Sequence, residues 1–356
     1  MSMRRPPVPR PPGVPEAPEA GDYATLPGGI LWIRLPIPGG LRHINVWLLP
    51  VHGGWRLVDT GMDTDDIRHA WQVLEGRLPL HRELQGILVT HHHPDHFGMA
   101  RWLAERHDVP VQMTRAAHAA ATRGLASDTE ETPSRSEEFA RRLGLDVDQD
   151  MRRILRGGVY RAIVSGGVAT SEVGEGDRVD AVDGCWTVSV HEGHAPGHAC
   201  LYDAGRGILV SGDQLLPSIS SNISLYPSNE LEDPLGQYLE SLQALCRLPE
   251  DTLVLPSHGN PFMSLHARAH SLREEHEGRL RSIVVALSSP MGTMDVAGRL
   301  FRLDRLDTLN RLLALTETLA HLRWLEVRGL VTRGGDGSQL RWSTTDASAA
   351  RLAPHR

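Results

Sequence analysis

Residues 87–96 read ILVTHHHPDH, an apolar run followed at once by histidine and aspartate side chains. The run from Ile87 to Thr90 predicts a buried strand, so the polar residues begin on the loop at its carboxyl end. Pro94 fixes one backbone angle in this loop and disfavours a helix that starts before Asp95. His92 is expected to alternate away from its neighbours. The candidate metal ligands of the loop are His91, His93, Asp95 and His96.

The spacing H-x-H-x-D-H favours a borderline transition metal. Magnesium and calcium prefer oxygen ligands, and an iron–sulfur cluster needs thiolates, which the loop lacks. Zinc is therefore the first expectation, with manganese or iron as alternatives. Any one of the nineteen histidines could lack a special role. Four such side chains on one buried loop would be costly without a metal.

Four further motifs follow in the chain and make the sequence resemble the metallo-β-lactamase-fold hydrolases. They are VDTG at 58–61, EGHAPGH at 192–198, GILVSGD at 207–213 and LVLPSHG at 253–259. The resemblance runs from about residue 22 to residue 262. It implies an α/β fold, a four-layer αββα sandwich, and it specifies the fold more closely than the substrate.

The resemblance also implies roles for individual residues. Asp59 would lie beneath the metal loop and support it, although a helix N-cap is the alternative. His198 would complete the ligands of the first metal, with His194 as the competing candidate and otherwise a supporting residue. Asp213 would bridge two metals, and His258 would close the second site.

The resemblance thus implies two zinc ions. The first is expected to bind His91, His93 and His198, the second Asp95, His96 and His258, with Asp213 shared. Two metals held in this way provide a bridging hydroxide as the nucleophile. Asp95 or Asp213 is expected to act in catalysis by orienting the hydroxide and passing a proton to the leaving group.

Composition restricts the other classes of function. The chain has a net charge of −7 and no lysine, so it lacks a global basic field and cannot form a lysine Schiff base. Its three cysteines are scattered, as in a cytoplasmic protein with reduced thiols. Residues 1–20 are rich in proline without an apolar stretch, so neither a signal peptide nor a membrane anchor is expected.

The chain is expected to divide into a disordered tail at 1–20, a catalytic domain at 21–262, a winged-helix-like α+β domain at 263–345 and a tail at 346–356. A helical insertion at about 114–167 would form one wall of a substrate pocket or decorate the surface. Candidate substrate contacts are Tyr160, Arg161, Asn222 and Tyr226.

The C-terminal quarter shows helical spacing at 264–287 and 306–328. Two short runs at 329–333 and 339–342 then flank GGDG at 334–337, which predicts a hairpin. Residues 279–345 contain ten arginines and six acidic residues, a mild surplus of positive charge. Packing against the catalytic domain or homodimer contacts are therefore favoured over RNA binding.

These patterns predict a cytoplasmic dinuclear zinc hydrolase that cleaves a thioester, ester or lactone in a small molecule. His93 stands where flavodiiron relatives carry an acid, which disfavours redox chemistry. Leu216 stands where many lactonases carry a tyrosine, which lowers the odds of a lactone. The alternatives are a metal-dependent endoribonuclease that holds RNA with the winged helix, and a non-catalytic binding module with a vestigial site. The complete set of seven ligands disfavours the latter.

Overall fold

The computed structural model describes residues 10–126, 135–229, 231–335 and 339–346. They form two compact units, each discontinuous in sequence. The first contains the described residues of Met1–Ala126, Tyr160–Ser221 and Leu242–Ala269, and the second those of Ser127–Val159, Asn222–Ser241 and His270–Arg356. These two compact units interleave along the chain, and the expected division into domains at residue 262 stays a prediction.

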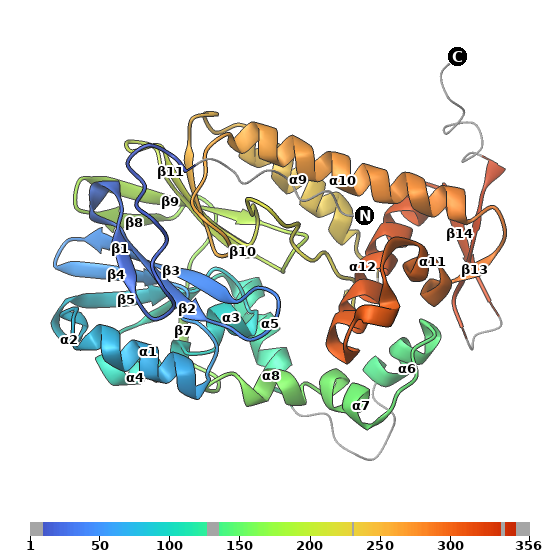
Figure 1. Cartoon of the computed structure of the whole chain (residues 1–356), viewed down its shortest axis with the longest axis horizontal. Coiled ribbons are helices and arrows are strands. Elements are labelled where there is room, and N and C mark those ends of the chain that lie inside the picture. Colours follow the sequence, from blue (N-terminus) through green and yellow to red (C-terminus); the bar gives the residue numbers. More distant parts are fainter. Residues whose placement is uncertain (1–9, 127–134, 230, 336–338, 347–356) are drawn as a thin grey trace. The chain divides into compact units, whose positions relative to one another are not determined.

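The first unit is built on a seven-stranded sheet with the strands in chain order (Figure 1). The strands from β1 to β4 pair antiparallel, and those from β4 to β7 pair parallel. The change occurs where tight turns give way to helical connections. The strands are β1 (Tyr23–Thr25), β2 (Leu31–Pro36), β3 (His43–Val51), β4 (Gly54–Val58), β5 (Leu84–Leu88), β6 (Val111–Met113) and β7 (Thr170–Glu172).

Helices cover one face of this sheet. The helix α1 (Asp65–Glu75) begins after Thr64, whose side chain accepts a hydrogen bond from the Ile67 N–H. The helical spacing of Ile67, Trp71 and Leu74 in the sequence predicts one apolar helix face, and this face is buried, with Trp71 fully enclosed. It packs in one apolar core with residues of α4 (Ala100–His107) and α5 (Arg115–Leu125) and with the sheet. The short helix α2 (Leu80–Glu83) leads into β5.

A second, five-stranded sheet packs on the opposite face. Its order is β12 (Leu253–Pro256), β11 (Ile208–Gly212), β10 (His198–Asp203), β9 (Gly184–His191) and β8 (Arg178–Ala181). Trp32 and Trp47 from the first sheet and Trp186 from the second share the core between them. The stacked sheets and covering helices confirm the expected α/β sandwich.

The two sheets place the polar motifs at the carboxyl ends of their strands. The pairs β4–β5 and β11–β12 are parallel, so the carboxyl ends within each pair lie together. Asp59 follows β4 and the histidine loop follows β5, while Asp213 follows β11 and His258 lies two residues beyond β12. Motifs far apart in the chain therefore start from neighbouring strand ends.

The second unit is helical with a small three-stranded sheet. The hairpin expected near residue 334 is confirmed, because β14 (Val331–Gly334) and β15 (Arg341–Thr344) pair antiparallel. Its GGDG turn lies partly outside the described residues. A further strand, β13 (Met291–Gly292), pairs with β15. The winged-helix assignment stays a prediction.

The other helices among the described residues, apart from that of the histidine loop, are α6 (Arg135–Arg142), α7 (Gln149–Leu155), α8 (Gly158–Ala162), α9 (Pro234–Leu245), α10 (Leu265–Ala286), α11 (Thr293–Leu300) and α12 (Thr308–Val327), with 3₁₀ turns at Pro27–Gly29 and Leu303–Arg305.

The two expected tails lie largely outside the described residues, at 1–9 and 347–356. Residues 10–20 contain no helix or strand. Among the described residues, no helix is long and apolar enough to cross a membrane.

Candidate metal centre

The histidine loop leaves β5 and turns into the short helix α3 (Pro94–Phe97). The helix begins at Pro94 itself, with His93 as the N-cap, whereas the sequence predicts no helix before Asp95. Proline is tolerated at the first helical position because the N–H that it lacks would have no intrahelical partner there. This early turn places Asp95 and His96 on the helix, while His91 and His93 remain on the loop before it.

Seven side chains gather into two groups of candidate ligands. One ligand atom of each member lies within 4.8 Å of those of the other members of its group. The first group is His91, His93, His194 and Asp213, and the second is Asp95, His96 and His258.

Asp213 lies between these groups. Its Oδ2 is 3.5 Å from His194 Nε2 in the first group, and its Oδ1 is 3.4 Å from His258 Nε2 in the second. Asp95 Oδ2 is 3.3 Å from the same His258 nitrogen. Asp213 Oδ2 also lies 3.6 Å from His96 Nε2 of the second group. One carboxylate is therefore within reach of both groups, as a shared ligand requires.

The chemistry of these side chains fits a pair of transition-metal cations. His96 Nε2, His258 Nε2 and Asp213 Oδ1 are buried without a hydrogen-bond partner among the described residues. His91 Nε2 lies 2.9 Å from His93 Nδ1 and 3.2 Å from His194 Nε2. Lone pairs thus converge from several directions on a buried space, an arrangement that is costly unless a cation satisfies them.

The pKa shifts differ between the two groups of candidate ligands. Burial and the neighbouring imidazoles hold the pKa of His91 well below its usual value, which keeps its ring neutral. Burial alone would lower the pKa of His258, but Asp213 and Asp95 raise it to about 10. Burial would raise the pKa of Asp213, yet His258 and His96 hold it well below its usual value. The carboxylates thus stabilise positive charge beside them.

The two histidines of the EGHAPGH motif at 192–198 lie differently relative to the other candidate ligands. The sequence favours His198, but this residue begins β10 and its Nε2 accepts a hydrogen bond from the Asp213 N–H at 3.1 Å. Its Nδ1 lies 3.8 Å from Cys200 Sγ. His194 lies on the preceding loop and joins His91 and His93. His198 stacks on His91 with ring centroids 4.8 Å apart, but its Nε2 already accepts from the Asp213 N–H, so the geometry favours His194 as the candidate ligand.

Asp59 lies directly beneath the loop. Its Oδ1 accepts a hydrogen bond from the Thr90 N–H at 2.8 Å, and its Oδ2 lies 2.8 Å from His96 Nδ1. Asp59 is buried and has a φ of 63°, in the left-handed region that asparagine and aspartate tolerate better than most residues. The second ring nitrogen of His96 is thereby left to face the candidate metal centre.

Asn45 is a supporting residue that the sequence reasoning missed. Its amide nitrogen donates to Pro256 O and Gly259 O at 2.8 and 2.7 Å, on either side of His258. Its amide oxygen accepts from Trp32 Nε1 at 2.8 Å. An asparagine within the apolar strand β3 was the available signal, because a buried amide needs several partners.

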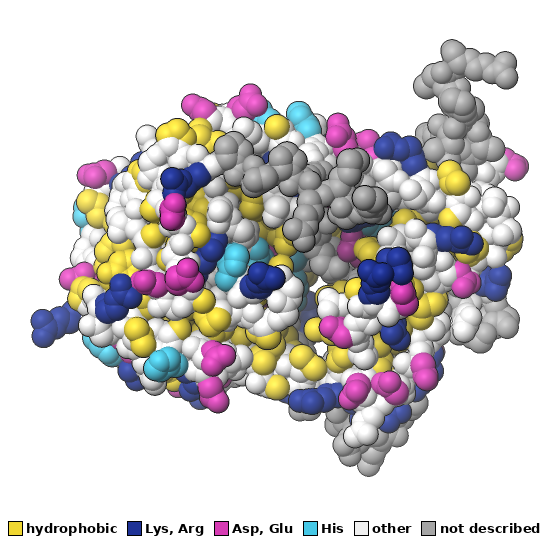
Figure 2. All heavy atoms as spheres, viewed as in Figure 1, with side chains coloured by type: hydrophobic (Ala, Val, Ile, Leu, Met, Phe, Trp, Pro, Cys, Tyr) yellow, Lys and Arg dark blue, Asp and Glu magenta, His cyan; other side chains and the backbone are white. Residues whose placement is uncertain are grey.

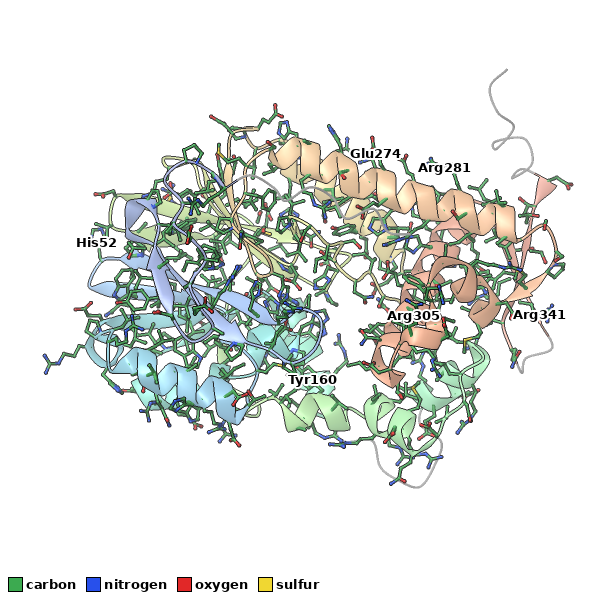
Figure 3. All side chains as sticks on the ribbon, viewed as in Figure 1. His52, Tyr160, Glu274, Arg281, Arg305 and Arg341 are labelled. Carbon is green, nitrogen blue, oxygen red and sulfur yellow. The ribbon has the colours of Figure 1, made fainter. Side chains whose placement is uncertain are left out.

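Tyr160 and Arg161 both use their polar groups within the first unit. Tyr160 lies on the helix α8 (Figure 3). Its hydroxyl donates a hydrogen bond of 2.7 Å to the His92 carbonyl oxygen. Burial raises the pKa of this hydroxyl, which keeps it protonated as a donor. Arg161 donates to Ala126 O at 3.0 Å. Tyr160 therefore holds the histidine loop, and contact of either residue with substrate stays a prediction.

We expect Tyr160→Phe to lower the free energy of unfolding by about 1–2 kcal/mol, because the His92 carbonyl loses its partner. The aromatic ring would still pack beside Gly124, where an added Cβ would lie 3.0 Å from the ring. Urea unfolding measures the loss. Tyr202→Phe is the matched control, since no hydrogen bond of the Tyr202 hydroxyl is found among the described residues. Equal stability of the two variants would remove this role for Tyr160.

Asn222 and Tyr226 belong to the second unit. Asn222 donates to Glu317 Oε2 at 3.2 Å, and the other oxygen of this buried carboxylate accepts from Arg279 at 2.6 Å. Tyr226 is 36% exposed. The Asn222 amide thus has a structural partner on α12, while contact of either residue with substrate stays a prediction.

A sandwich of two sheets that gathers histidines and carboxylates at its strand ends is the architecture of a metal-dependent hydrolase. The profile of the Metallo-beta-lactamase superfamily matches residues 39–258, and the chain belongs to this superfamily. The profile of the Metallo-beta-lactamase-like, C-terminal domain matches residues 280–345.

The chain is similar to proteins of comparable length from several bacteria. The probable metallo-hydrolase YqjP of Bacillus subtilis is 25% identical over 320 residues, which cover 88% of this chain and 98% of that protein. The hydroxyacylglutathione hydrolase of Methylobacillus flagellatus is 29% identical over 237 residues, covering 66% and 69%. A solved beta-lactamase domain protein from Burkholderia ambifaria is 35% identical with a TM-score of 0.85, covering 94% and 97%. A metallo-beta-lactamase family protein from Thermus thermophilus is 28% identical with a TM-score of 0.77, covering 90% and 99%.

Proposed function

We propose that this protein is a cytoplasmic dinuclear zinc hydrolase that cleaves a carboxylic ester-type bond in a small molecule. We propose thioesters as the first choice of substrate class, followed by esters and lactones. The observation that carries the proposal is the position of Asp213, whose carboxylate lies within reach of both groups of candidate ligands. The similarity to a hydroxyacylglutathione hydrolase supports the choice of a thioester.

The ligand assignment follows the geometry of the two groups. We propose His91, His93 and His194 for the first zinc and Asp95, His96 and His258 for the second, with Asp213 shared. Bound zinc supplies hydroxide near neutral pH and positive charge for a developing oxyanion. No serine or cysteine nucleophile is then needed.

The residues of the chain contribute orientation and proton transfer. Asp59 and the His43 carbonyl, which lies 2.9 Å from His258 Nδ1, fix the rings of His96 and His258. The Asp95 side chain is 12% exposed, so it borders both the ligands and solvent. We propose that Asp95 Oδ2 accepts a proton from the attacking water and passes it to the leaving sulfur or oxygen, with Asp213 as the alternative.

No specific observation favours the endoribonuclease alternative. On the visible face, the described residues show acidic and basic side chains interspersed without a continuous basic stripe (Figure 2). Binding along an RNA backbone depends on a concentrated field of positive charge. Domain packing or homodimer contacts stay our prediction for the C-terminal region.

A substrate panel with matched metal states tests the proposal. The zinc-loaded protein should hydrolyse activated thioesters, and a chelator should abolish turnover that added Zn²⁺ restores. The panel also contains esters, lactones, an activated phosphodiester and single-stranded RNA. Cleavage of the phosphodiester or RNA without cleavage of any carboxylic substrate would contradict the proposal.

A further inference from the structure

A second cluster of metal-ligating side chains lies in the first unit, on elements that contribute nothing to the metal centre described above. Glu75 is the last residue of α1, His107 is the last residue of α4, and His81 lies in α2. One ligand atom from each lies within 4.8 Å of those of the other two. The three helices lie near one another beside the seven-stranded sheet (Figure 1).

The geometry at His107 leaves its imidazole unsatisfied. Its side chain is 0% exposed, and both ring nitrogens lack a hydrogen-bond partner among the described residues. Glu75 Oε1 lies 2.9 Å from His107 Nε2, close enough for both atoms to bind one cation. The His81 ring lies 4.7 Å from the His107 ring between centroids. An enclosed imidazole whose nitrogens make no hydrogen bond is costly, and a cation shared with Glu75 and His81 would satisfy it.

The electrostatics of the helix ends favour a cation at this place. Each helix carries partial negative charge at its carboxyl end, and both α1 and α4 end at a residue of the cluster. Arg106 donates to both oxygens of Glu75 at 2.7 Å. An ionised carboxylate has about four lone-pair positions, so this pairing leaves Oε1 able to bind a further cation.

We propose that Glu75, His81 and His107 bind one divalent transition-metal ion, with zinc as the first choice. Two imidazoles and one carboxylate are a zinc-type ligand set, and His81 is exposed, so water can complete the coordination. The bound ion would link the ends of α1 and α4 to α2, just before β5. Its role is structural, and it is independent of the proposed hydrolase activity.

Metal stoichiometry of the full-length protein tests this site. After equilibrium dialysis against Zn²⁺, His107→Gln should retain one ion fewer per chain than the unaltered protein. His81→Ala should also weaken binding of that ion, and its exposed position spares the fold. His270→Ala removes an exposed histidine of α10 and should retain the full metal content. Zinc should raise the melting temperature less in the first two variants than in this control.

The test compares the zinc content of each variant with that of the unaltered protein, so it remains valid if the metal centre fails to bind zinc. In that case the unaltered protein would hold one ion and His107→Gln none. Equal zinc content and equal thermal shifts in the unaltered protein, His107→Gln and His81→Ala would overturn the third site. Circular dichroism confirms that each variant is folded before the metal is counted.

Discussion

Asp213→Ala is expected to reduce the rate of thioester hydrolysis on the order of 10³-fold or more, because the charge that faces both candidate metals disappears. The substitution also leaves His258 Nε2 and His194 Nε2 without the carboxylate that lies 3.4 and 3.5 Å away. Steady-state rates with saturating Zn²⁺ and metal content per chain measure the effect. Both should fall together if Asp213 is a shared ligand.

His93→Ala should cause a loss of similar size, since it removes one ligand of the first group. Two exposed positions provide matched controls. Asp183 has a side chain that is 86% exposed, and His52 lies in the turn between β3 and β4 (Figure 3). Asp183→Ala and His52→Ala should retain full activity. Retained turnover in Asp213→Ala or His93→Ala would place the chemistry elsewhere in the chain.

Asp59→Asn is expected to weaken zinc binding about 10–100-fold, although Asp59 is not itself a proposed ligand. Asparagine keeps the size of the side chain and tolerates the left-handed backbone at φ 63°. Its amide cannot accept from both the Thr90 N–H and a protonated His96 Nδ1, which two carboxylate oxygens now contact. The His96 ring then loses its fixed orientation, and competition with a zinc chelator measures the change.

The matched control for Asp59→Asn is Asp108→Asn. Asp108 also has a positive φ, 53°, and it caps α4. The same substitution in the same backbone region should leave zinc affinity at the metal centre unchanged. Activity of Asp59→Asn should recover in part at high zinc concentration, because binding is weakened while the proposed ligands remain. Unchanged affinity would mean that Asp59 serves the backbone turn alone.

Short-range patterns in the sequence by themselves determine much of the fold. The spacing of Ile67, Trp71 and Leu74 predicted α1, and turn residues near 334 predicted the β14–β15 hairpin. The resemblance carried by the motifs from VDTG to LVLPSHG implied the α/β sandwich, which the structure confirms, and a set of candidate ligands that stays a prediction. Such features are visible in a sequence because period, turn chemistry and ligand type are properties of neighbouring residues.

The tertiary structure decided what depends on distant parts of the chain. Pairing of β10 with β9 and β11 turned His198 toward the Asp213 N–H and left His194 to face the histidine loop. Asn45 reaches the loop around His258 across more than 200 residues, and Glu75, His81 and His107 meet only because helix ends converge. The spacing of residues along the sequence does not predict these contacts. They arise from strand register and helix packing, which bring residues together through the whole fold.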